Sequence, residues 1–202
     1  MKLLCFSGLS AGGLICDLLN GTRSMIKDGL VLNNEHNVFK GLTPWMEKAP
    51  FNRTLWLSQL SSLKLLPPEK QKRYFGTHSH PTEIPKQVLE AFDEVLVVTC
   101  MARESKFYKY LRHLHVNPNP GSGLDIETIC MDFPPVNNCL SVEFSDIVNG
   151  DFVKIRNLDQ EHFDNWKKAN SFLYEEQKAK EVTQFESLLE SYRKLESYRK
   201  DN

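Results

Sequence analysis

A run of small residues between two apolar segments offers the clearest chemistry in this chain. Residues 7–13 read Ser-Gly-Leu-Ser-Ala-Gly-Gly, after a strand-length apolar run and before a helix-like apolar pattern at residues 14–19. A strand, a small-residue loop and a helix can point backbone N–H groups at one anion. The residues expected to bind a phosphate are Ser7, Gly8, Ser10, Ala11, Gly12, Gly13 and Leu14. A tight turn that binds nothing is the alternative.

The histidines are the other residues that could form a site. His78 directly follows a predicted strand at residues 72–77, in a polar loop that also carries His80. Its position alone fits a loop histidine with a structural hydrogen bond. The pairs His78/His80 and His113/His115 could hold a metal, but no carboxylate lies nearby at the usual spacing, and residues i and i+2 of a helix point apart. We predict no metal site.

Apolar segments that alternate between strand and helix patterns predict the fold. The run 94–100 is continuously apolar and rich in β-branched residues, which favours burial on both faces of a parallel sheet. Further strands are expected at residues 72–77, 125–131 and 140–144, and helices at residues 103–115 and, after Asp159, 161–198. We predict an α/β fold with a mostly parallel central sheet of four or five strands, helices on both faces and a long C-terminal helix.

Composition limits the class of protein. The chain has 202 residues and a formal net charge of −1, which argues against a general nucleic-acid surface. Its five cysteines are odd in number and scattered, as in proteins of reducing compartments, and no apolar run reaches the length of a membrane span. The one lysine before the first apolar run and the missing cleavage site disfavour a signal peptide. We expect a cytoplasmic protein with no membrane and no nucleic-acid partner.

Three segments, in this order and at about this spacing, resemble one family. They are the loop 7–13, the stretch Thr77-His78 with Pro81 and Pro85, and the buried run 94–100 followed by a basic helix. This arrangement is similar to the sulfotransferases that use 3′-phosphoadenosine 5′-phosphosulfate. The resemblance covers residues 1–175, which we take as one domain, and leaves residues 176–202 as a charged helical extension that could mediate self-association.

The resemblance implies roles for particular residues. The first loop would hold the 5′-phosphosulfate, and His78 would be the catalytic base that takes a proton from a hydroxyl acceptor, either a small molecule or a glycan. Arg103 and Ser105 would bind the 3′-phosphate; an exposed helix residue is the alternative for Arg103. The strand at 72–77 should then lie beside the first strand, so that His78 approaches the region of Gly12 with room for a sulfuryl group between them.

One departure from the family pattern leaves other functions open. The family loop usually reads Pro-Lys-Ser-Gly-Thr-Thr, and Leu9 stands where its lysine would be. A catalytically inactive relative that binds a nucleotide or serves in assembly is therefore an alternative. A P-loop kinase is another, although the chain lacks the G-x-x-x-x-G-K-[ST] spacing.

Overall fold

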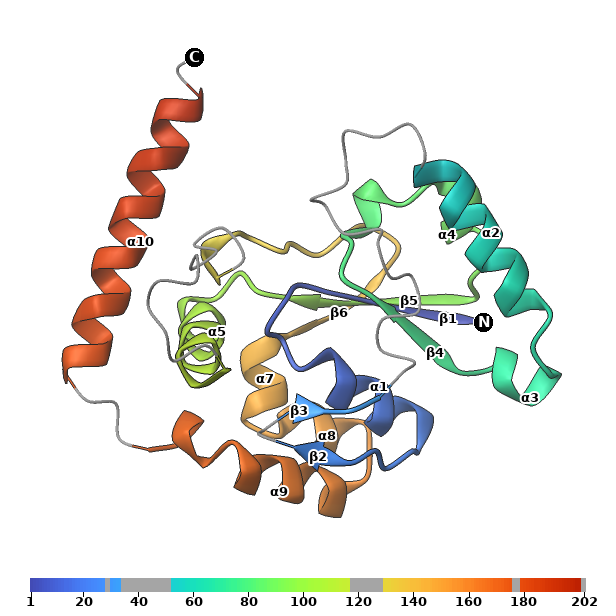
Figure 1. Ribbon diagram of the computed structural model, residues 1–202, viewed down its shortest axis with the longest axis horizontal. Coiled ribbons are helices and arrows are strands. Elements are labelled where there is room, and N and C mark those ends of the chain that lie inside the picture. Colours follow the sequence, from blue (N-terminus) through green and yellow to red (C-terminus); the bar gives the residue numbers. More distant parts are fainter. Residues whose placement is uncertain (28–29, 34–51, 117–128, 176–178, 201–202) are drawn as a thin grey trace.

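The computed structural model is organised around a four-stranded parallel sheet (Figure 1). It describes residues 1–27, 30–33, 52–116, 129–175 and 179–200. The strands are β1 (Lys2–Phe6), β4 (Tyr74–Thr77), β5 (Glu94–Thr99) and β6 (Leu140–Glu143), in the spatial order β4-β1-β5-β6. All three strand pairings are parallel. The predicted α/β fold is thus confirmed, and the order brings the ends of β1 and β4 side by side.

The two central strands are apolar because both of their faces are covered. Leu4 pairs with Gly76 of β4 on one side and with Leu96 of β5 on the other, and both leucines are fully buried. Strand β6 forms an edge, and its Leu140 is exposed. The continuous apolar run of β5 therefore reflects its place inside the sheet.

Helices surround the sheet, and a small hairpin lies beside it. In Figure 1, α1, α7, α8 and α9 lie below the sheet, while α2 and α4 lie above it. Strands β2 (Ile26–Lys27) and β3 (Leu30–Val31) pair antiparallel as a separate two-stranded sheet. The helices are α1 (Gly12–Asn20), α2 (Asn52–Lys64), α3 (Pro68–Gln71), η3 (Pro81–Glu83), α4 (Lys86–Leu89), α5 (Arg103–Val116), α7 (Phe144–Val148), α8 (Asp151–Ile155), α9 (Gln160–Ala169), η4 (Ser171–Leu173) and α10 (Ala179–Lys200).

The prediction of one helix over 161–198 was wrong, because the segment divides into α9, η4 and α10. Asn170 ends α9: its side-chain amide donates to the carbonyl of Trp166, and its side-chain oxygen accepts from Arg112. A short polar side chain that bonds in this way competes with the helical backbone. The predicted strand at 125–131 was wrong where it can be compared, since Ile129 and Cys130 are helical and residues 125–128 lie outside the described residues.

Helix α10 packs on the body through an aromatic contact. The ring of Phe185 lies 5.1 Å from that of Phe107 and 5.5 Å from that of Tyr110, measured between centroids, and both partners belong to α5. The last turns of α10 carry the exposed side chains of Leu195 and Tyr198. Among the described helices, none is both long and apolar enough to cross a membrane.

Candidate anion-binding site

The loop after β1 has an unusual backbone. Leu9 and Ala11 adopt left-handed conformations, with φ values of 68° and 56°, although neither is glycine. Such a conformation costs a residue with a Cβ atom about 1–2 kcal/mol. Ala11 is the residue before the first turn of α1 and supplies no side-chain cap. The strain is held by the strand on one side and the helix on the other.

The first turn of α1 leaves donors available. The hydroxyl of Ser10 donates to the carbonyl of Ser7 at 2.6 Å, so it is turned back into the loop. Within the described chain, no acceptor bonds the N–H groups of Gly12, Gly13 or Leu14. The positive end of this nine-residue helix therefore carries three backbone donors that the described chain does not use.

The two glycines that begin α1 are required by close packing. A Cβ atom on Gly12 would lie 2.1 Å from Cε2 of Phe6, and one on Gly13 would lie 2.7 Å from the carbonyl oxygen of Val31. A Cβ atom essentially never lies this close to another heavy atom, so either substitution would displace its neighbour. The small residues thus have a packing role, whether or not an anion binds beside them.

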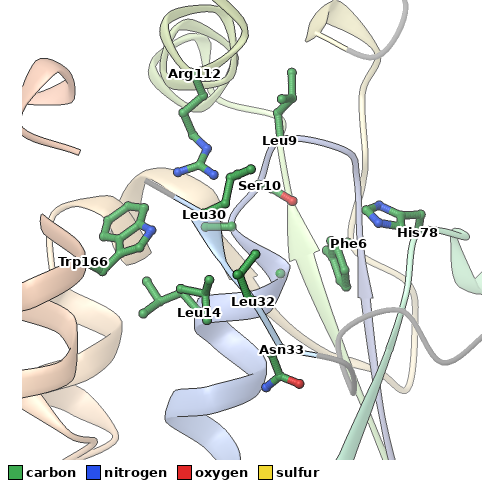
Figure 2. A pocket seen from close by; sticks show the side chains of 14 residues that line it. Phe6, Leu9, Ser10, Leu14, Leu30, Leu32, Asn33, His78, Arg112 and Trp166 are labelled. Carbon is green, nitrogen blue, oxygen red and sulfur yellow. The ribbon is translucent and has the colours of Figure 1, made fainter. Parts of the chain in front are cut away.

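A cavity of about 330 Å³ opens beside this loop (Figure 2). Its wall combines the loop and helix α1, the hairpin end, the residue after β4, helix α5 and helix α9. Most of the lining is apolar, as is usual for ligand sites. The lining residues are Phe6, Leu9, Ser10, Ala11, Gly12, Gly13, Leu14, Leu30, Val31, Leu32, Asn33, His78, Arg112 and Trp166.

Arg112 is the most informative residue of the cavity. Figure 2 shows its guanidinium pointing from α5 into the cavity, beside Trp166 of α9. The side chain is only 4% exposed, and its Nε has no hydrogen-bond partner among the described residues. Its Nη1 donates to the side chain of Asn170 at 2.9 Å, and the guanidinium lies 5.6 Å from the Trp166 ring. Within the described residues, no carboxylate forms an ion pair with it.

The charge of Arg112 is costly in this position. Burial lowers the pKa of Arg112 to about 10, which still leaves the guanidinium protonated at neutral pH. Buried charges in folded proteins are usually paired with an opposite charge. Among the residues that the structure describes, the positive charge of Arg112 therefore has no counter-charge, and it lies in the same cavity as a helix N-terminus. An anion would complement both.

His78 borders the cavity from the other side. Strand β4 pairs with β1 as expected, so His78, directly after β4, lies near the start of α1. The ring of Phe6 packs edge-on against the imidazole, with centroids 4.5 Å apart, and the same ring covers Gly12. Figure 2 shows Phe6 between α1 and His78. The space predicted for a sulfuryl group between His78 and Gly12 is thus filled by an aromatic ring.

A buried carboxylate holds the hairpin against the cavity. Asp17 of α1 is fully buried and accepts five hydrogen bonds, two from Ser24 and one each from Thr22, Asn33 and His162. Asn33 also lines the cavity. Helix α1, the hairpin segment and α9 are therefore joined at one point just behind the cavity wall.

The structure brings some of the predicted site residues together and not others. Ser10, Ala11, Gly12, Gly13, Leu14 and His78 line the cavity, whereas Ser7, Gly8, Arg103 and Ser105 do not. The Ser7 hydroxyl lies 3.4 Å from the sulfur of Cys100, a thiol whose pKa is raised by burial. The Ser105 hydroxyl is buried and accepts from the backbone N–H of Ser145. Arg103 bonds the carboxylate of Glu186 on α10.

Sequence reasoning missed Arg112, Trp166 and Asn33. A signal for the arginine was present, because Ser105, Lys109 and Arg112 follow the i, i+4, i+7 spacing of one helix face. All three are buried in α5. Polar side chains that recur on the buried face of a helix indicate a binding or catalytic site. For Trp166 and Asn33 no local signal distinguishes them from core and loop residues.

The remaining histidines of the two pairs have separate surroundings. His80 caps η3, and its ring nitrogens lie 2.7 Å from the Thr82 hydroxyl and 3.0 Å from the carbonyl of Pro134. The ring of His115 stacks on Phe172. In the part of the chain that the structure describes, no group of three or more His, Cys, Asp or Glu residues could hold a metal ion.

Comparisons with protein-family models, with curated proteins and with solved structures returned no match for this chain. The assignment of a function therefore depends on the geometry of the cavity and on its charges.

Proposed function

We propose that the protein binds a ligand bearing a phosphate or sulfate group in the cavity beside α1. The uncompensated charge of Arg112 is the observation that supports this most directly. A guanidinium can bond a phosphate or sulfate through two parallel N–H groups. Since Nη1 of Arg112 donates to Asn170, Nε and Nη2 are the pair that could do so. The free N–H groups of Gly12, Gly13 and Leu14 would contribute from the helix end.

The family resemblance suggests which nucleotide to try first. In that interpretation 3′-phosphoadenosine 5′-phosphosulfate places its phosphosulfate at the loop and the first turn of α1. Arg112 lies seven residues after Ser105 on the same face of α5. In this interpretation Arg112, and not Arg103, binds the 3′-phosphate. Binding without catalysis fits the absence of a lysine in the loop, where Leu9 stands. A cytoplasmic protein that binds this nucleotide is the form of the proposal that the resemblance implies.

Calorimetry on three proteins tests the binding proposal. The ligands are adenosine 3′,5′-bisphosphate and, separately, inorganic sulfate. Arg112→Met should weaken binding of either ligand by about 10- to 150-fold, the value of hydrogen bonds to a charged group. Arg156→Met removes an exposed arginine elsewhere on the surface and serves as the matched control. Binding by the Arg112→Met variant at wild-type strength would refute the proposal.

Sulfuryl transfer to a hydroxyl acceptor is the second candidate, because His78 lines the same cavity as the first turn of α1. His78 would accept the hydroxyl proton while the new S–O bond forms and the bond between sulfur and the 5′-phosphate oxygen breaks. The ring of Phe6 would have to move aside for the acceptor to reach His78. Transfer to a small phenol or a glycan can be followed by the release of adenosine 3′,5′-bisphosphate.

The His78→Ala variant separates catalysis from binding. If His78 is the base, the variant should lose about 10²–10⁴-fold in transfer rate and bind the nucleotide as the wild type does. Loss of binding and transfer together would give His78 a structural role. A wild-type protein that binds the nucleotide and transfers nothing to any hydroxyl tried would leave the binding function alone.

A further inference from the structure

The charge of the cavity lining limits the ligand that it can hold. Of the described lining residues, Arg112 is the one with a permanent charge. The other polar side-chain groups belong to Ser10, Asn33, His78 and the indole N–H of Trp166. The guanidinium carries one positive charge, and the N-terminus of α1 is equivalent to about half a positive charge. Together they complement a single anionic group. Two phosphates carry about −3 to −4 at neutral pH, which is well beyond what this lining neutralises.

The rest of the cavity lining is apolar and would contact an apolar part of the ligand. Leu9, Leu14 and the hairpin residues Leu30 and Leu32 face the cavity together with Trp166 (Figure 2). Leu30 is 38% exposed and Leu32 is 52% exposed, so a ligand would cover leucine surface that now faces water. Burial of such surface is the main favourable contribution to binding in sites of this kind.

The two kinds of surface come from different elements around the cavity. Arg112 and Trp166 come from α5 and α9, while the leucines come from the loop, α1 and the hairpin. The volume, about 330 Å³, suits one compact organic molecule. We infer that the ligand is an amphipathic monoanion, with one sulfate, sulfonate, phosphate or carboxylate group at Arg112 and a compact aryl or alkyl body against the leucines.

This inference rests on the proposed anion-binding function and narrows its ligand. The charged group and the apolar body should therefore contribute separately. The anion should depend on Arg112, and the body should depend on the exposed leucines of the hairpin, Leu30 and Leu32.

The test compares three probes by calorimetry: 2-naphthalenesulfonate, inorganic sulfate, and 2-naphthol, which has the same body without the anion. The sulfonate should bind at least tenfold more tightly than either other probe. Arg112→Met should weaken binding of the sulfonate by about 10- to 150-fold and leave binding of the naphthol unchanged. Leu32→Ser should weaken binding of the sulfonate by about tenfold, since one apolar side chain contributes on this scale, and leave binding of sulfate unchanged.

The matched control for the hairpin leucine is Leu65→Ser, which changes a leucine that is 87% exposed just after α2 and outside the cavity. It should bind all three probes as the wild type does. A sulfonate that binds no better than sulfate, or equally well to Arg112→Met, overturns the inference. If adenosine 3′,5′-bisphosphate binds through Arg112 and the sulfonate does not, the inference fails and the proposed function stands; if no anion binds, both fail.

Discussion

At the scale of single residues, the most telling feature is a buried charge for which the described part of the chain supplies no counter-charge. Arg103 and Arg112 belong to the same helix, but Arg103 bonds Glu186 at the surface while Arg112 is buried beside Trp166. An exposed ion pair contributes little to stability and needs no ligand. A buried guanidinium opposes folding unless something outside the chain compensates it, which is typical of a binding residue.

Stability should therefore change in the opposite direction to binding at Arg112. Arg112→Met keeps most of the buried volume. Removal of the desolvated charge should raise the free energy of unfolding by about 1–4 kcal/mol. Loss of the hydrogen bond to Asn170 should lower it by about 1 kcal/mol. We expect the free energy of unfolding in urea to stay level or rise. A fall of several kcal/mol would instead show that Arg112 stabilises the fold.

Gly12 provides a second test at this scale. Gly12→Ala adds a methyl group against the Phe6 ring, and overpacking of this kind costs about 1–3 kcal/mol. Phe6→Leu should relieve the clash, so the double variant should be more stable than the sum of the two single effects. Urea unfolding of the four proteins gives the coupling energy. Additive effects would mean that the ring does not restrict Gly12.

At the scale of elements, Asp17 joins three pieces of the chain that are distant in sequence. Its carboxylate lies on α1, accepts from Ser24 and Asn33 at the two ends of the hairpin, and lies 3.0 Å from Nε2 of His162 on α9. Because the hairpin has only two residues in each strand, this carboxylate rather than strand pairing positions that wall of the cavity.

Replacement of that carboxylate should loosen the hairpin. Asp17→Asn has the same shape but presents N–H groups to some of the donors, and we expect a loss of about 3 kcal/mol in the free energy of unfolding. Hydrogen exchange at the N–H of Ser24 should become faster. Asp164→Asn on the exposed face of α9 is the control and should stay within about 0.5 kcal/mol of the wild type.

The C-terminal helix gives the other prediction about elements. Phe185 of α10 is fully buried against Phe107 and Tyr110, so Phe185→Ala should cost about 3–5 kcal/mol if α10 folds together with the body. A separate, earlier unfolding transition confined to α10 would instead support a boundary near residue 175. Self-association through the exposed end of α10 stays a prediction, to be measured by sedimentation across concentration.

At the scale of the whole molecule, the fully covered sheet buries ionisable thiols. All five cysteines are free, and Cys5 of β1 and Cys100 after β5 are completely buried. Burial, followed by the nearby groups of Cys139 and Glu83, raises the pKa of Cys5 well above its ordinary value; burial also raises the pKa of Cys100. Both thiols therefore stay protonated in the fold at a pH where the unfolded chain would ionise them.

This difference predicts alkaline destabilisation. Because the folded pKa values are raised, the free energy of unfolding is unaffected by these thiols below the unfolded pKa of about 8.5 and falls as the pH rises above it. The loss would be at most about 2 kcal/mol for each thiol at pH 10. Urea unfolding from pH 7 to 10 measures the slope. Cys5→Ala with Cys100→Ala should give a shallower slope, and an unchanged slope would point to other groups.

The alternation of strands and helices and the parallel arrangement of the sheet could be predicted from local sequence patterns. The apolar run of β5, the small-residue turn after β1 and the start of α9 at Asp159 each have a local physical cause, so all three could be predicted. His78 could be placed near the loop because parallel strands end at one edge. The site itself depended on tertiary packing: the approach of Trp166 to Arg112 and of the Phe6 ring to His78 are contacts between segments far apart in the chain. Such contacts leave no local period in the sequence, because they depend on how α5, α9 and the hairpin pack around the end of β1.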